Sequence, residues 1–114
     1  MNCISTHILD LTHGKPAADV SVRLEKHESS ENWRLLTSAH ADQDGRCLQL
    51  LPEGEDHLPG VYRLIFDTGN YFKLQKIVAL YPVVAVTFQV QEGESHFHLP
   101  LLLSPNGYTT YRGT

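Results

Sequence analysis

The stretch "HFHLPLLLS", residues 96–104, carries the clearest strand pattern in the chain. Successive side chains of a strand point to opposite faces. One face is therefore wholly hydrophobic and is predicted to lie in the core: Phe97, Leu99, Leu101 and Leu103. The opposite face combines His96 and His98 with the apolar Pro100 and Leu102. Because an outer face with this much apolar surface is usually covered, we expect something to pack on it.

The same alternation extends outward along the chain. Val20, Val22 and Leu24 alternate with polar residues, and turns such as "THGKPAAD" and "DQDG" separate the alternating segments. Period-two alternation between turns is typical of strands with one face in a core. Strands are predicted over residues 3–10, 20–27, 33–38, 61–67, 83–90, 97–103 and 107–113, with a further strand beginning at Arg46.

Residues 68–82, "TGNYFKLQKIVALYP", depart from this pattern. Tyr71, Leu74 and Val78 recur at helical spacing, and Pro82 ends the pattern because proline does not continue a helix. One short helix is predicted here. About eight short strands with one helix and no internal repeat indicate a single all-β domain, residues 1–114, built as a sandwich of two antiparallel sheets. A closed barrel is the alternative architecture.

Composition excludes several classes of partner. The chain has 114 residues, with 9 basic and 13 acidic side chains and a formal net charge of −4. This balance gives no positive field for a phosphate backbone, so nucleic acid is not an expected partner. No run of about 18 apolar residues suggests a membrane span. Cys3 and Cys47 form neither a CxxC pair nor a zinc-finger pattern, and the first residues lack signal-peptide features. A reduced, cytoplasmic location is expected.

Two predicted strands carry a histidine on the face opposite the core. His98 lies opposite the leucine face of residues 97–103, and His7 lies opposite Ile4 and Ile8 in residues 3–10. If these strands and residues 107–113 belong to one sheet, His7, His98 and Tyr111 converge. The half-apolar outer face is most economically covered by another copy of the chain, and closed symmetric oligomers are the common outcome.

Three segments together resemble the hydrolase branch of the transthyretin-like family: "THILDLTHGKPAADVSVRL", "DQDGR" and "HFHLPLLLSPNGYTTYRGT". The closing "YRGT" is similar to the Tyr-Arg-Gly-Ser signature that separates these hydrolases from the hormone carrier transthyretin. The resemblance spans nearly the whole chain. Two positions depart from the family pattern: Thr114 replaces the usual serine, and Asn106 stands where an aromatic residue is common.

The resemblance implies a transthyretin-like β-sandwich of two four-stranded antiparallel sheets with one short helix. It also implies a homotetramer, a dimer of dimers, with active sites in a channel between dimers. The implied reaction is the hydrolysis of 5-hydroxyisourate, in which water attacks a ring carbonyl and opens the ring to a ureidoimidazoline carboxylate. The substrate is a small molecule formed by urate oxidation, and no metal or organic cofactor is implied.

The matched positions supply the groups that such a hydrolysis needs. His7 and His98 are predicted to position and deprotonate water, and which of them is the base is left open. Arg46 is predicted to bind the urate-like anion and stabilise developing charge, because its planar guanidinium suits such oxygens. Tyr111 offers a hydroxyl and a flat face for the ring, and Thr114 offers a hydroxyl.

Two alternatives compete with the metal-free hydrolase. His96 and His98 point the same way from one strand and, with His7, would give three zinc ligands for a metal-dependent hydrolase. A non-enzymatic carrier of small ligands on the same sandwich is the alternative from another class. The remaining histidines are expected to be surface or locally satisfied residues: His13, His27, His40 and His57.

Overall fold

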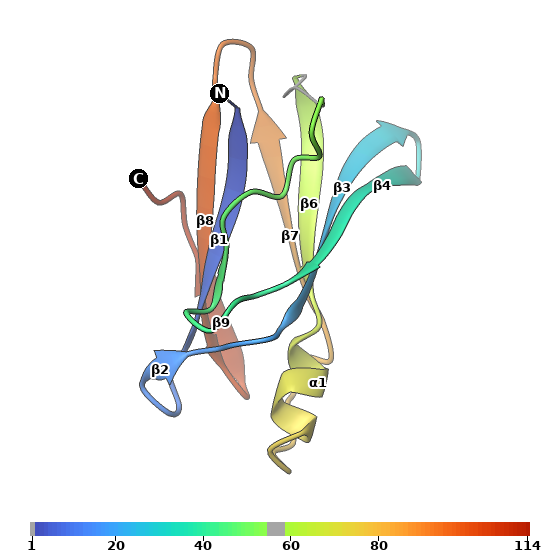
Figure 1. Cartoon of the computed structure of the whole chain (residues 1–114). Coiled ribbons are helices and arrows are strands. Elements are labelled where there is room, and N and C mark those ends of the chain that lie inside the picture. The colour runs from blue at the N-terminus through green and yellow to red at the C-terminus, as the bar shows by residue number, and fades with distance from the viewer. Residues whose placement is uncertain (1, 55–58) are drawn as a thin grey trace.

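A computed structural model describes residues 2–54 and 59–114. The described chain forms two packed sheets with one short helix at one end (Figure 1). The first sheet has the strand order β2 (Lys15–Pro16), β1 (Cys3–Asp10), β8 (His96–Ser104), β9 (Gly107–Thr110), and β5 (Arg46–Cys47) also pairs with β1. The second sheet has the order β4 (Asn32–His40), β3 (Ser21–Ser29), β6 (Gly60–Phe66), β7 (Val84–Val90). The predicted two-sheet sandwich is confirmed.

Strand pairing differs from the prediction in one place. β1 and β8 run parallel, with Ser5 opposite His98 and His7 opposite Pro100, whereas the other strand pairs of the described residues are antiparallel. A parallel pair needs a long connection between its strands. Here that connection includes the whole second sheet, because β1 and β8 come from opposite ends of the chain (Figure 1). The first sheet also has five strands rather than four, because β2 and β5 both join β1.

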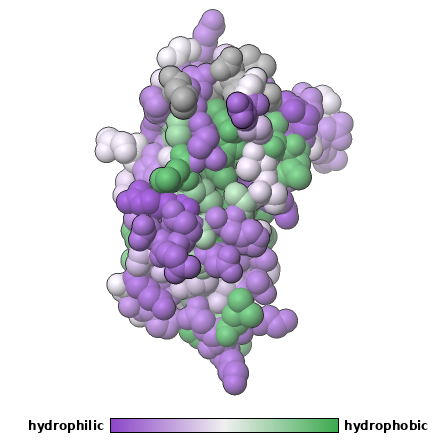
Figure 2. All heavy atoms as spheres, in the orientation of Figure 1, coloured by the Kyte–Doolittle hydropathy of each residue, from purple (hydrophilic) through white to green (hydrophobic). Residues whose placement is uncertain are grey.

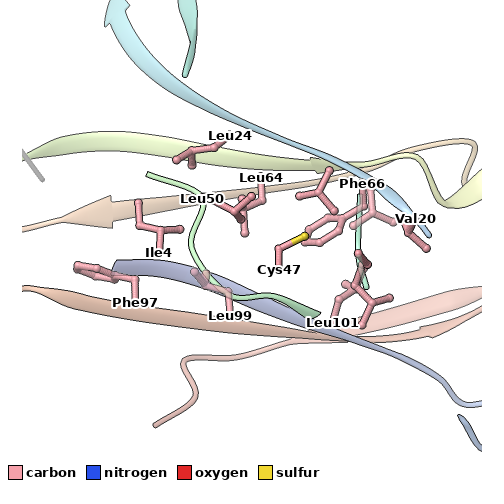
Figure 3. Packing of buried hydrophobic residues seen from close by; sticks show 14 of the residues in the cluster. Ile4, Val20, Leu24, Cys47, Leu50, Leu64, Phe66, Phe97, Leu99 and Leu101 are labelled. Atoms are coloured by element: carbon pink, nitrogen blue, oxygen red, sulfur yellow. The ribbon is translucent and has the colours of Figure 1, made fainter. Parts of the chain in front are cut away.

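The core lies between the two inner faces. The four hydrophobic residues predicted for β8 are buried: Phe97, Leu99, Leu101 and Leu103. Figure 3 shows side chains of both sheets pointing toward one another, with Cys47 and Leu50 between them. Burial of such aliphatic and aromatic side chains contributes about 1.5–3 kcal/mol each before the entropy cost of folding is counted. The alternation therefore leaves the opposite face of β1 and β8 free for polar side chains.

The helix α1 (Thr68–Lys73) is shorter than its apolar pattern suggests. Phe72 is the aromatic residue that it buries, whereas Leu74 is 78% exposed and Val78 is 91% exposed. The prediction that Leu74 and Val78 continue the helical pattern is therefore wrong. The helix ends at Lys73, and Lys76 in the turn that follows has a left-handed φ of 61°, a conformation that does not continue a helix. Figure 2 shows a separate hydrophobic patch over α1.

The remaining features of the chain concern a loop, its cysteines and membrane spans. The stretch "LPEGEDHLPG", residues 51–60, predicts a surface loop, and its residues 55–58 lie outside the described residues. Neither cysteine forms a disulfide: Cys3 is partly exposed and Cys47 is buried. No helix in the described chain is long and apolar enough to cross a membrane.

Candidate active site

A pocket of about 440 Å³ lies where the two ends of the chain meet on the first sheet. Its polar lining includes Ser5 of β1, Arg46 of β5 and His98 of β8. Leu48 supplies apolar surface, and Thr114 contributes from the last residues of the chain. The site therefore joins residues from opposite ends of the sequence, which β1 and β8 bring side by side.

A tight turn sets the position of Arg46. The Asp42 carboxylate accepts hydrogen bonds from the backbone N–H groups of Asp44 and Arg46, both at 2.9 Å. Gly45 has a φ of 76°, and a Cβ there would lie 2.4 Å from the backbone oxygen of Ile8. Only glycine permits both this backbone conformation and this close approach. The turn thus presses against β1 and starts β5 at Arg46.

Register places Arg46 beside His7. The two residues are directly opposite in the antiparallel pair of β1 and β5, so their side chains share one face of the sheet. Nε2 of His7 donates a hydrogen bond to the backbone oxygen of Asp44 at 2.9 Å. His7 is not among the residues that line the pocket, but it contributes electrostatically to the lowered pKa of His98.

His98 is held from one side by a serine hydroxyl. The Oγ atom of Ser5 lies 2.8 Å from Nδ1 of His98, because the parallel register puts the two residues opposite each other. Burial, followed by the positive charge of Arg46 and the electrostatic effect of nearby His7, lowers the pKa of His98 below its ordinary value of 6.5. The imidazole is therefore neutral near pH 7 and can accept a proton.

Arg46 differs from the other arginines of the chain. Arg23, Arg34, Arg63 and Arg112 each pair with a glutamate. Within residues 2–54 and 59–114, no carboxylate lies within ion-pair distance of the Arg46 guanidinium. A half-buried guanidinium with open donors in a pocket is suited to bind an anionic ligand.

The closing residues of the chain are fixed against β8. Arg112 donates to Glu94 at 2.7 Å and to the backbone oxygen of His96 at 3.0 Å. The N–H of Gly113 donates to the backbone oxygen of His98 at 2.7 Å. A Cβ at Gly113 would lie 2.7 Å from Cδ2 of His98, so the side chain of any other residue would displace the imidazole. This packing brings Thr114 to the pocket.

Only some of the site residues predicted from the sequence line the pocket. Arg46, His98 and Thr114 line the pocket, and His7 lies beside Arg46. Tyr111 follows the end of β9, is 54% exposed and is not among the lining residues. β1, β8 and β9 do share one sheet, which was the condition for the predicted convergence of His7, His98 and Tyr111.

The other histidines have local partners. Nδ1 of His13 lies 2.7 Å from the Asp10 carboxylate, Nε2 of His27 lies 2.6 Å from the backbone oxygen of Ser30, and His40 lies 3.5 Å from Asp19. His57 lies outside the described residues. In the described part of the chain no three His, Cys, Asp or Glu side chains are grouped as metal ligands, so His7, His96 and His98 do not form the three-histidine cluster considered above.

Sequence reasoning missed Ser5, Cys3 and Leu48 as pocket residues. Alternation did place Ser5 on the same face as His7, but it could not show that Ser5 is opposite His98, since that depends on the parallel register. Sequence reasoning also did not predict that Arg112 fixes the closing segment through Glu94.

Fold and pocket together define a β-sandwich protein with a polar pocket on the outer face of one sheet. The site offers a neutral imidazole, an open guanidinium and hydroxyl groups, which together can bind an anion and move a proton. Residues 4–113 match the model of the HIUase/Transthyretin family. The chain belongs to this family.

Individual relatives agree with this assignment. The 5-hydroxyisourate hydrolase of Salmonella dublin is 46% identical over 113 residues, which cover 99% of this chain and 82% of that protein. The 5-hydroxyisourate hydrolase of Mus musculus is 41% identical over 112 residues, which cover 97% of this chain and 94% of that protein.

Solved structures of two kinds share the fold. The 5-hydroxyisourate hydrolase of Klebsiella pneumoniae has a TM-score of 0.86 at 32% identity, and the match covers 100% of both chains. The transthyretin of Sparus aurata has a TM-score of 0.90, also at 32% identity, and the match covers 99% of this chain and 97% of that one. The fold alone therefore does not separate hydrolase from carrier.

Proposed function

We propose that this protein hydrolyses 5-hydroxyisourate in urate degradation. The observation that carries the proposal is the placement of His98 and Arg46 in one pocket, where Arg46 has no carboxylate partner among the described residues and the pKa of His98 is lowered. The relatives named 5-hydroxyisourate hydrolase support it, since they match the chain over nearly its whole length.

The proposed chemistry is water attack on a ring carbonyl without a metal. Arg46 binds the anionic ring and stabilises the negative charge that develops on the carbonyl oxygen. A histidine takes a proton from water as the new C–O bond forms, and the proton then passes to the ring nitrogen as the C–N bond breaks. His98 lines the pocket, and His7, opposite Arg46, helps to position the water.

We also propose roles for the other two predicted contact residues and a subunit assembly for the protein. Thr114 offers its hydroxyl to the substrate from the pocket wall, whereas Tyr111 lies outside the pocket of its own chain. A homotetramer built as a dimer of dimers, with its sites in a channel between dimers, covers the outer face of the first sheet and adds contacts to the ring. A cytoplasmic location is supported by the free thiols of Cys3 and Cys47.

The direct test mixes the protein with freshly made 5-hydroxyisourate and follows the ultraviolet decay of the substrate. The expected result is a decay rate that exceeds the spontaneous rate and rises in proportion to protein concentration. A decay rate equal to the spontaneous rate would refute the proposed function. Size-exclusion chromatography with light scattering tests the tetramer separately.

A small-ligand carrier is the second candidate, because the transthyretin of Sparus aurata shares the fold with a TM-score of 0.90. A carrier needs shape and apolar contact, and it has no need for a neutral imidazole beside an open guanidinium. Saturable binding of 5-hydroxyisourate without faster ring opening would favour the carrier.

A further inference from the structure

His7 and His98 have ring nitrogens with different kinds of partner. Nε2 of His7 lies 2.9 Å from the backbone oxygen of Asp44, and a carbonyl oxygen can only accept a hydrogen bond. Neutral His7 must therefore carry its proton on Nε2. The partner of His98 is instead the Ser5 hydroxyl, at 2.8 Å from Nδ1, and a hydroxyl can donate or accept.

The other ring nitrogen of His98, Nε2, has no protein partner among the described residues. Both His98 and Ser5 line the cavity. The neighbouring ring atom, Cδ2, packs close to Gly113, which limits rotation of the imidazole. Nε2 is thus the atom that can act on water or substrate, but only if Nδ1 carries the single proton of the neutral ring.

We propose that Ser5 is a positioning residue for ring opening: its Oγ accepts a hydrogen bond from Nδ1–H of His98 and so keeps Nε2 unprotonated toward the pocket. This inference rests on the proposed function and assigns the base to His98. When Nε2 takes a proton from water, Nδ1–H continues to donate to Ser5, so the hydroxyl stabilises the imidazolium as well. The proton on Nε2 then passes to the ring nitrogen as the C–N bond breaks, which restores neutral His98.

Ser5 is suited to this role by the fold. The parallel register of β1 and β8 makes it the direct neighbour of His98, and it lies on the outer face with His7. It is half-buried, so replacing its hydroxyl with hydrogen leaves no core cavity. Loss of the hydroxyl removes the acceptor that favours the Nδ1–H form, so the Nε2–H form becomes populated and the base is lost in that fraction.

The test compares Ser5→Ala with Ser5→Thr, which keeps the hydroxyl, and with Ser38→Ala, which makes the same change on the exposed edge of β4. Proteins with ¹⁵N-labelled histidine report the tautomer of His98 through its ring-nitrogen chemical shifts. The wild type is expected to show protonated Nδ1 and unprotonated Nε2 above the pKa of His98. Ser5→Ala is expected to gain the Nε2–H form, and Ser5→Thr to restore the wild-type pattern.

Kinetics supply the second readout. Ser5→Ala is expected to lower kcat roughly 2- to 10-fold, the range that one neutral hydrogen bond supports, with KM little changed. Ser5→Thr should recover most of kcat, and Ser38→Ala should match the wild type. An active wild type with protonated Nε2, or a Ser5→Ala variant with unchanged tautomer and kcat, would overturn the role of Ser5. A wild type that does not accelerate substrate decay would instead refute the proposed function.

Discussion

Two polar clusters are attached to β1, and they differ in how completely their groups are paired. On the outer face, Ser5 contacts His98, and Arg46 lies in the same pocket without a carboxylate partner among the described residues. At the inner end of the strand, the Asp10 carboxylate is 1% exposed. It accepts hydrogen bonds from the hydroxyl of Tyr71 at 2.7 Å and from His13.

The inner cluster is a closed network. Burial alone would raise the pKa of Asp10, but hydrogen bonds from Tyr71 and His13 lower it below the ordinary value. Burial and the bond to Asp10 raise the pKa of Tyr71 to about 12. Tyr71 belongs to α1, so the network ties the helix to the end of β1. Satisfied buried groups of this kind stabilise a fold, whereas groups with open donors and acceptors can bind and react.

The largest expected effect separates the two clusters by activity. His98→Ala should lower the rate of 5-hydroxyisourate hydrolysis by about 10²- to 10⁴-fold, because a positioned base is lost. The thermal midpoint should stay close to that of the wild type, since His98 is only half-buried. Steady-state kinetics and a melting curve on the same preparation measure both quantities. Normal turnover would remove His98 from the site, and the same test applies to His7→Ala.

Asp10→Ala should lower stability and retain activity, the reverse of the pattern expected for His98→Ala. Removing the buried carboxylate leaves the hydroxyl of Tyr71 and the imidazole of His13 without their acceptor, which costs about 3–5 kcal/mol in the free energy of unfolding. Urea denaturation measures this loss. Activity per folded molecule should be retained, because Asp10 lies on the inner face. A variant as stable as the wild type, or a folded one that is inactive, would break the contrast between the clusters.

The lowered pKa of Asp10 also determines how the free energy of unfolding changes at acid pH. In the folded state Asp10 binds its proton less readily than in the unfolded state, where its pKa is near 3.8. Its contribution to stability is therefore fully present above pH 3.8 and is lost as the pH falls through the folded-state pKa. Unfolding free energies measured as the pH falls below 4 should decrease more steeply for the wild type than for Asp10→Ala.

Tyr71→Phe tests the same network with a smaller expected loss of stability. Loss of one hydrogen bond to a charged acceptor should cost about 1.5–3 kcal/mol. The folded-state pKa of Tyr71 is raised to about 12 from 10, so its contribution is present below pH 10 and is lost as the pH rises toward 12. Denaturation at pH 8 and pH 11 should therefore show a smaller difference between wild type and variant at pH 11. An equal difference at both pH values would contradict this assignment.

The smallest expected effect lies within the pocket. After burial, the charge of Arg46 is the next cause of the lowered pKa of His98. Arg46→Gln removes that charge, so the pKa of His98 should rise toward 6.5. A titration followed by NMR measures the shift without relying on activity. Arg23→Gln, on the second sheet, is the control and should leave the titration unchanged. An unaltered pKa in Arg46→Gln would show that the two side chains do not interact.

Much of this arrangement could be predicted from the sequence, because the alternation of apolar and polar residues determines on which face of a strand each side chain lies. It placed Phe97 in the core and His98 outside it, and the "DQDG" turn before Arg46 is the observed turn. Alternation does not determine which strand is the neighbour. The parallel pairing of β1 and β8, and with it the contact between Ser5 and His98, depends on long-range packing.

In the helix, the sequence pattern predicted the wrong buried residues. Leu74 and Val78 have helical spacing, yet the helix ends at Lys73 and both side chains are exposed. Phe72, which lies outside that pattern, is the residue that packs into the core. A six-residue helix is too short for periodicity to identify its buried face. The Asp10 network was equally hidden, because its partners lie 61 residues apart in sequence.

The central claim is that a neutral imidazole at His98 drives ring opening in the pocket. The most direct measurement is the pH dependence of kcat/KM for 5-hydroxyisourate, which reports ionisation in the free enzyme. Because the pKa of His98 is lowered, kcat/KM should fall on acidification with its midpoint below pH 6.5. A midpoint above pH 6.5, or a profile in which no acid limb appears while the protein stays folded, would contradict the account.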